Sequence, residues 1–155
     1  MKFRNLIILI LPFLLVASSC KKVDSEEQAN IDDSTILKFI SEKNIPAQKH
    51  SSGVYYQILS PGTGSISYTS NTTVSTKYTG RLLNGSVFDG TTTQPISFKL
   101  GQVITGWQIG IPLIQKGGKI RLFIPSGLAY GPQGQGPIPG NAILDFDIEL
   151  LDVTN

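Results

Sequence analysis

Hydrophobic and polar positions alternate from about residue 53 to the end of the chain, in short runs that are typical of β-strands. The runs cover residues 54–59, 72–79, 87–88, 96–100, 120–124 and 142–153. An Asn84-Gly85 pair after the second run predicts a tight hairpin turn, because both residues accept positive φ. We expect the polar side of the last run to meet solvent. That side holds Asp145, Asp147, Glu149 and Asp152.

Two segments follow a helical pattern instead. Residues 104–114 place large apolar side chains roughly on one face, and Gly106 and Pro112 keep that helix short. Upstream, apolar residues at positions 36, 37, 39 and 40 predict a short helix within residues 31–44. Its candidate N-caps are Asp32, Asp33 and Ser34. The predicted fold class is therefore α+β, with one strongly twisted antiparallel β-sheet wrapped around one short α-helix.

The first twenty residues have the pattern of an export signal. Lys2 and Arg4 precede an apolar run over residues 6–16, which is shorter than the roughly 20 residues that span a bilayer. Cys20 is the only cysteine and follows Ala-Ser-Ser, so it resembles the lipidated cysteine of a bacterial lipobox. We interpret residues 1–19 as a signal peptide and Cys20 as a lipidation site. Ordinary signal cleavage beside an incidental thiol is the alternative.

This interpretation divides the mature chain into three parts. Residues 20–30 are the lipidated Cys20 and a polar tether, residues 31–52 a short helix and linker, and residues 53–155 one folded domain. The net charge of the whole chain is +2, but removal of residues 1–19 leaves 11 basic against 11 acidic side chains. Because no basic patch with interleaved aromatic residues is present, we expect no nucleic-acid partner.

The sequence lacks the residue sets of most hydrolytic or metal-dependent sites. Its only histidine, His50, lies in the linker, so neither a Ser-His-Asp set nor a His/Cys metal cluster is expected. The Gly-rich residues 131–140 lack the lysine of a phosphate-binding loop. What remains is apolar and aromatic chemistry, with Asp89 directly after Phe88 and with Tyr130 just beyond a strand that Pro125 ends.

One reaction suits such a site. Rotation about an X–Pro peptide bond breaks no covalent bond, yet the loss of amide resonance sets a barrier of roughly 18–20 kcal/mol. The twisted amide is less polar than the planar one, so an apolar pocket that excludes water favours it. Each ~1.4 kcal/mol of that preference gives about tenfold in rate.

An ordered set of motifs resembles FKBP-type peptidyl-prolyl isomerases over about 100 residues. The motifs are Val-Ser-Thr-Lys-Tyr-Thr-Gly at 74–80, Gly-Ser-Val-Phe-Asp at 85–89, Phe-Lys-Leu-Gly-Gln-Val-Ile-Thr-Gly-Trp at 98–107, Gly-Gly-Lys-Ile-Arg-Leu-Phe-Ile-Pro at 117–125, Leu-Ala-Tyr-Gly at 128–131 and Asp-Phe-Asp-Ile-Glu-Leu-Leu at 145–151. The resemblance implies the FKBP-like fold, no cofactor and no metal.

The resemblance also implies roles for particular residues. Trp107 becomes the floor of a pocket for the proline ring, and Ile138 lies in a loop that overhangs it. The Ile104 N–H and the Tyr130 hydroxyl each hold a substrate carbonyl, and Asp89 orients Tyr78 or polarises the site. The implied walls of the pocket are Tyr78, Phe88, Val103, Ile104 and Phe146.

The chain departs from the family pattern at the rim of this pocket. Ile96 stands where an aromatic wall is common, and residues 90–94 form a shorter segment without a basic residue. Pro137 and Gly140 also replace residues that often stand in the overhanging loop. These changes bear on substrate preference and on macrolide affinity more than on catalysis.

The sequence therefore predicts a peptidyl-prolyl cis-trans isomerase that acts on exported proteins, with proline-containing polypeptides as substrates and macrolides as candidate inhibitors. Its predicted location is outside the cytoplasm, on the periplasmic side of a membrane or at the cell surface, held by the lipid anchor. The alternative function is a non-catalytic module that binds proline segments or acts as a chaperone.

Overall fold

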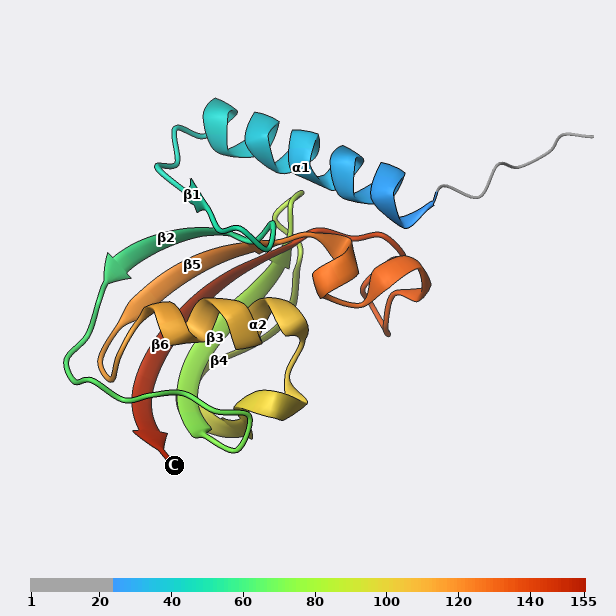
Figure 1. Cartoon of the computed structure of the whole chain (residues 1–155). Coiled ribbons are helices and arrows are strands. Elements are labelled where there is room, and N and C mark those ends of the chain that lie inside the picture. The colour runs from blue at the N-terminus through green and yellow to red at the C-terminus, as the bar shows by residue number, and fades with distance from the viewer. Residues whose placement is uncertain (1–23) are drawn as a thin grey trace, which may run out of the picture.

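The computed structural model describes residues 24–155, so the predicted signal peptide and Cys20 lie outside the described residues. Two helices and six strands make up most of this part (Figure 1). They are α1 (Ser25–Glu42), β1 (Gln48–Lys49), β2 (Tyr55–Ser60), β3 (Thr73–Leu82), β4 (Val87–Lys99), α2 (Thr105–Gly110), β5 (Lys119–Ile124) and β6 (Leu144–Thr154). Four 3-10 turns join them: η1 (Leu100–Gln102), η2 (Ile111–Leu113), η3 (Ser126–Leu128) and η4 (Gly131–Gln133). Among these residues, no helix is long and apolar enough to cross a membrane.

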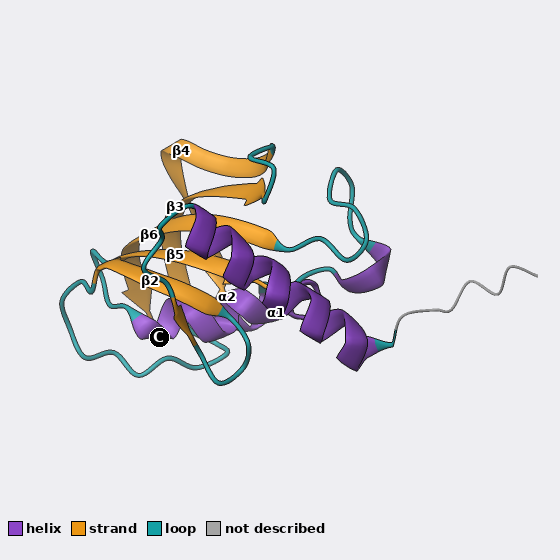
Figure 2. Ribbon diagram, turned by 90° about the horizontal axis from the view of Figure 1, so that it is seen from above, coloured by secondary structure: helices purple, strands orange, loops and turns teal. Residues whose placement is uncertain are grey.

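The six strands form one antiparallel sheet in the order β1-β2-β5-β6-β3-β4. Alternate residues of β5 face opposite sides: Leu122 belongs to the main core under α2, and Phe123 to a second core under α1. The two helices therefore cover opposite faces of the twisted sheet (Figures 1 and 2). The predicted α+β class, with a sheet around a short helix, is confirmed.

Strand β4 is one long strand, where the sequence pattern predicts two short runs. Tyr78 of β3 pairs with Thr91, but Thr76 pairs with Ile96, so β4 carries extra residues between these two positions. The strand tolerates this bulge because it lies at the edge of the sheet, where the extra residues disturb no outer neighbour. Residues 90–94 therefore belong to the strand and its bulge, not to a separate loop.

Helix α1 is longer than expected, and it includes residues 25–30 of the predicted tether. Its start is fixed by Asp24, whose side chain accepts a hydrogen bond of 2.8 Å from the Glu27 N–H. Glu26 and Glu27 add negative charge to the first turn, where it opposes the helix dipole. Packing also stabilises the helix, because the buried face of α1 lies on Phe123 and its neighbours. Residues 25–30, predicted to be part of an irregular polar tether, are therefore helical.

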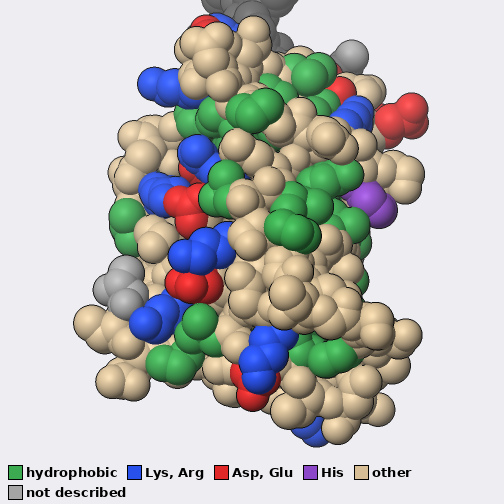
Figure 3. All heavy atoms as spheres, turned by 90° about the vertical axis from the view of Figure 1, so that its left-hand side faces the viewer, with side chains coloured by type: hydrophobic (Ala, Val, Ile, Leu, Met, Phe, Trp, Pro, Cys, Tyr) green, Lys and Arg blue, Asp and Glu red, His purple; other side chains and the backbone are tan. Residues whose placement is uncertain are grey.

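The polar face of β6 is not uniformly solvated. Asp145 is only 3% exposed, and the Arg121 guanidinium donates to both of its oxygens at 2.9 and 2.8 Å. Arg121 in turn lies over the Phe123 ring, 5.0 Å from its centroid, at the border of the core under α1. The expectation of a solvated Asp145 is therefore wrong, because alternation cannot show that a second helix covers this end of the sheet. Figure 3 shows acidic and basic side chains mixed on the surface turned to the viewer, without a patch of one sign.

Candidate active site

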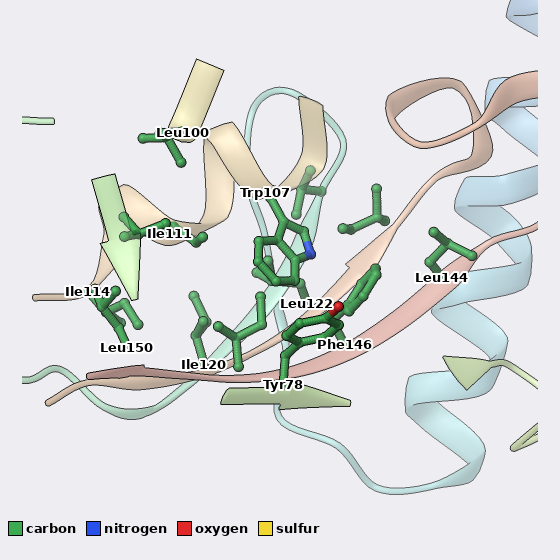
Figure 4. Packing of buried hydrophobic residues seen from close by; sticks show 14 of the residues in the cluster. Tyr78, Leu100, Trp107, Ile111, Ile114, Ile120, Leu122, Leu144, Phe146 and Leu150 are labelled. Carbon is green, nitrogen blue, oxygen red and sulfur yellow. The ribbon is translucent and has the colours of Figure 1, made fainter. Parts of the chain in front are cut away.

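The centre of the candidate site is the indole of Trp107, the third residue of α2. Its side chain is 4% exposed and meets the rings of Tyr78 and Phe146 edge to face, with centroid distances of 5.1 and 5.3 Å (Figure 4). Helix α2 can lie close to the sheet because Gly106 has no Cβ: such an atom would stand 2.4 Å from Ile124. The close approach seats the indole against the aromatic side chains of β3 and β6.

A pocket of about 310 Å³ opens above this indole. Its lining residues come from β3, β4, β6, α2 and the segments before and after the helices. They are Tyr78, Phe88, Asp89, Phe98, Gln102, Val103, Ile104, Trp107, Tyr130, Gln135 and Phe146. Eight predicted site residues are thus brought together, and most of the wall is apolar.

Ile138 does not line this pocket, in contrast to its predicted place above it. The side chain is buried in the main core. Its backbone closes a tight turn with Gln135, in which each N–H donates to the other carbonyl at 2.9 Å. The turn sends the apolar Ile138 inward, where burial is favourable. Gln135 contributes to the pocket instead.

Phe98 contributes an aromatic ring to the pocket wall and is not among the predicted wall residues. Its ring meets Trp107 edge to face at 5.8 Å and Tyr78 at 6.1 Å. Ile96, at the position where an aromatic wall is common, is 41% exposed and does not line the pocket. The alternation over residues 96–100 indicates that Phe98 points to the same face as the buried Leu100, and this signal could have identified it.

Tyr78 and Asp89 form the main polar contact of the site. The Tyr78 hydroxyl donates to Asp89 Oδ2 at 2.7 Å, and the Gly90 N–H donates to Asp89 Oδ1 at 2.8 Å. Burial, and after it the bond to Asp89, raises the pKa of Tyr78. Tyr78 therefore stays neutral and keeps the carboxylate oriented at the pocket edge.

Tyr130 reaches the rim from the segment after β5. Pro125 ends the strand, η3 turns the chain, and Gly131 at φ 62° lets it turn again directly after the tyrosine. Burial first, and the charge of Asp89 second, raise the pKa of Tyr130. Within residues 24–155 its hydroxyl has no hydrogen-bond partner, so a protonated donor is available at the pocket.

A second donor is the backbone N–H of Ile104, which precedes α2. The Ile104 carbonyl accepts from Trp107 and Gln108 at 2.9 and 3.2 Å, which fixes the peptide at the start of the helix. Its N–H has no acceptor in the described part of the chain. The pocket thus offers an apolar slot with two hydrogen-bond donors, and residues 24–155 contain no cluster of three potential metal ligands.

Comparisons with known proteins agree with this geometry. Residues 64–151 match the sequence profile of the family described as FKBP-type peptidyl-prolyl cis-trans isomerase. A probable FKBP-type peptidyl-prolyl cis-trans isomerase of Haemophilus influenzae is 42% identical over 144 residues, which are 90% of this chain and 58% of that protein. FkpA of Escherichia coli K12 is 46% identical over 118 residues, 75% of this chain and 43% of its own length. The chain therefore spans about half the length of these relatives.

Solved structures show the same fold. The crystal structure of FkpA from Escherichia coli matches with a TM-score of 0.72 and 38% identity, over 83% of this chain and 62% of that one. A peptidyl-prolyl cis-trans isomerase from Pseudomonas syringae pv. tomato matches with a TM-score of 0.69 and 34% identity, over 86% of this chain and 98% of that one.

Proposed function

The chain belongs to the family of FKBP-type peptidyl-prolyl cis-trans isomerases, and from this premise we propose that it accelerates the rotation of X–Pro peptide bonds in polypeptides. The observation that carries the proposal is the aromatic pocket of about 310 Å³ above Trp107, with donors at its rim. Its size and apolar walls suit a proline ring.

In the proposed mechanism, the proline ring lies on Trp107 and the peptide carbonyls remain near the rim. The Ile104 N–H binds one carbonyl and holds the chain in place. The Tyr130 hydroxyl binds a carbonyl next to the bond that rotates. Because the apolar walls exclude water, they destabilise the planar, more polar amide relative to the twisted one, and this difference lowers the barrier.

Asp89 acts on this mechanism through Tyr78. The carboxylate holds the phenol by a hydrogen bond of 2.7 Å, so the Tyr78 ring keeps its place in the wall beside Trp107. The main contribution to rate comes from the apolar slot. The Tyr130 hydroxyl contributes about one hydrogen bond, worth roughly 0.5–1.5 kcal/mol.

A protease-coupled or NMR exchange assay over a panel of X–Pro peptides tests the proposal. We expect rates above the uncatalysed control, and Tyr130→Phe should keep the fold and lose about two- to tenfold of the rate. Folded protein that gives only the uncatalysed rate would overturn the enzymatic function.

Binding of proline segments without turnover is the second candidate function. The departures at the rim support it: Ile96 is 41% exposed and Ile138 is buried in the main core, so neither side chain lines the pocket. Variants of Asp89 and Tyr130 distinguish the two functions: a pure binder loses affinity but has no isomerase rate to lose.

We also propose that the substrates are exported polypeptides and that Cys20 carries a lipid anchor. Lys2, Arg4 and the apolar residues 6–16 support export, and the Ala-Ser-Ser-Cys sequence supports lipidation. Acyl chains contribute about 0.8 kcal/mol per buried CH₂, so several of them would hold the protein at a membrane. Radioactive palmitate should label the wild type but not Cys20→Ala, and equal labelling of both would refute the anchor.

A further inference from the structure

Helix α1 contacts the segment that carries Tyr130 through a buried carboxylate. Asp32 is 2% exposed, and its Oδ2 accepts two hydrogen bonds from Ser126, from the backbone N–H at 2.7 Å and from the hydroxyl at 2.6 Å. Its Oδ1 accepts from the Gln28 amide at 2.8 Å. Each carboxylate oxygen of Asp32 is thus occupied, and Ser126 is itself buried.

Ser126 lies just beyond the end of β5, where the chain no longer forms hydrogen bonds with the sheet. The last pairing of β5 joins Ile124 to Leu144, and Pro125 has no N–H to continue the ladder. The Ser126 N–H is therefore bonded by α1 instead of by a strand. In Figure 1 the first half of α1 lies beside the orange segment that follows β5, and the two elements are in contact.

A short hydrogen-bonded turn connects Ser126 to Tyr130. The Leu128 N–H donates to the Pro125 carbonyl at 2.9 Å, and the Ala129 N–H donates to the Ser126 carbonyl at 3.1 Å. Tyr130 follows at once, and the Gly131 carbonyl beyond it accepts from Asn141 at 2.8 Å. A displacement of Ser126 is therefore transmitted to Tyr130, because the first two of these hydrogen bonds tie the residues between them to Pro125 and Ser126.

We propose that Asp32 is a positioning residue for the isomerase site: through Ser126 it holds the segment of residues 126–130 and so places the Tyr130 hydroxyl at the pocket rim. This inference rests on the proposed role of Tyr130. It gives α1, which lies outside the matched family region of residues 64–151, an influence on the pocket through Ser126.

The neighbouring Asp33 provides a matched control. It also joins α1 to the sheet, because its Oδ1 accepts from the Tyr55 hydroxyl at 2.7 Å and pairs with Lys49 at 2.5 Å. These partners lie on β2 and β1, not on the Tyr130 segment. Asp33→Asn therefore weakens the attachment of α1 without touching Ser126.

The experiment compares Asp32→Asn, Ser126→Ala and Asp33→Asn in the full chain, each with and without Tyr130→Phe. We expect Asp32→Asn to lower kcat by about two- to tenfold, no more than Tyr130→Phe does, and to have little further effect in the Tyr130→Phe background. Ser126→Ala keeps the backbone hydrogen bond and should show a smaller loss. Asp33→Asn should leave kcat unchanged.

Backbone NMR resonances of residues 127–131 give a readout that does not depend on activity. The inference predicts that they shift in Asp32→Asn and Ser126→Ala but not in Asp33→Asn. Unchanged resonances in Asp32→Asn, or equal kcat losses in Asp32→Asn and Asp33→Asn, would overturn it. If Asp32→Asn does not fold, Ser126→Ala tests the proposal in its place, by the resonances of residues 127–131 and by its kcat compared with that of Asp33→Asn. If Tyr130→Phe alone retains the full rate, the role of Tyr130 fails, and the resonances then decide whether Asp32 positions the segment.

Discussion

The Tyr78 hydroxyl donates to Asp89 Oδ2 at 2.7 Å across the β3–β4 pair, and this bond links a buried ring to the pocket edge. The Asp89 charge faces two phenols, since it also acts on Tyr130. Burial first, and Asp89 second, raise the pKa of both tyrosines, so both favour the neutral form more than free tyrosine does. The carboxylate thus adds to the effect of burial in keeping the two hydroxyl donors protonated at alkaline pH.

Replacing the carboxylate should lower the pKa of both phenols. In Asp89→Asn the tyrosinate form no longer faces a negative charge, so the ultraviolet absorbance of tyrosinate should rise at lower pH than in the wild type. Burial remains, and it is the larger cause of both shifts. The pKa values should therefore stay above 10.0, the ordinary value for tyrosine.

The same substitution has a consequence for stability. The pKa of Tyr78 is higher in the folded protein than its ordinary value of 10.0. The neutral phenol therefore stabilises the fold fully below pH 10.0, and this stabilisation is lost as the pH rises through the folded-state pKa. The wild type should therefore lose more stability than Asp89→Asn between neutral and strongly alkaline pH, as measured by urea unfolding. An identical alkaline titration in both proteins would contradict the electrostatic link.

Gly80→Ala should disturb the pocket wall with little effect elsewhere. A Cβ at this position would lie 2.6 Å from Phe146 Cε1 and 2.7 Å from the Phe88 ring. The two rings now meet edge to face at 5.5 Å, so at least one must move. We expect KM for X–Pro peptides to rise and the free energy of unfolding to fall by about 1–3 kcal/mol.

Gly127→Ala is the control for this change, because nothing lies within 4 Å of the Cβ it would introduce. Its KM should match the wild type. An unaltered KM in folded Gly80→Ala would show that the Phe88–Phe146 pair does not bind the substrate.

The resemblance to FKBP-type isomerases predicts the pocket residues, and eight of them line one pocket. Local patterns alone predict the elements and faces that hold some of them. Trp107 lies on the apolar face of a predicted helix, and Tyr78 and Phe146 lie on alternating strands that pair side by side. Periodic patterns of this kind depend on neighbouring residues only, so they identify the helix or strand that holds a residue and the face on which its side chain lies.

The errors arise where packing against distant segments, or a turn, decides where a residue lies. The length of α1 depends on burial against Phe123, and the burial of Asp145 depends on contacts with strands far away in the sequence. Ile138 points inward because of a turn with Gln135, whose direction no alternation encodes. Long-range packing overrides the local pattern at α1 and at Asp145, and a local turn decides the direction of Ile138.

The ion pair of Asp145 should be important for stability. Arg121→Ala removes the two hydrogen bonds at 2.9 and 2.8 Å and leaves a buried carboxylate with Arg81 at 3.6 Å as its remaining partner. We expect the free energy of unfolding to fall by roughly 2–3 kcal/mol, since an undercompensated buried charge is costly. Chemical unfolding measures this loss.

An exposed pair on the same strands serves as the comparison. Lys119 and Glu149 lie 3.2 Å apart with their side chains 52% and 36% exposed. Lys119→Ala should cost at most about 1 kcal/mol, because solvent screens such pairs. Equal losses for Arg121→Ala and Lys119→Ala would argue against a special role of the buried pair.

Trp107→Phe should separate the activity of the site from the stability of the fold. The indole Nε1 is buried and has no hydrogen-bond partner in the described part of the chain, so phenylalanine removes no protein hydrogen bond. It does shorten the floor of the pocket, so the proline ring loses contact area. We expect kcat/KM to fall by about tenfold, and the free energy of unfolding by only about 1–2 kcal/mol.

Tyr55→Phe is the matched control for Trp107→Phe, since Tyr55 is equally buried but faces α1 and donates to Asp33. It should lose comparable stability and keep kcat/KM, as measured by unfolding and by the isomerase assay on the same samples. If both variants lost activity in proportion to stability, Trp107 would be a core residue without a direct role in substrate binding.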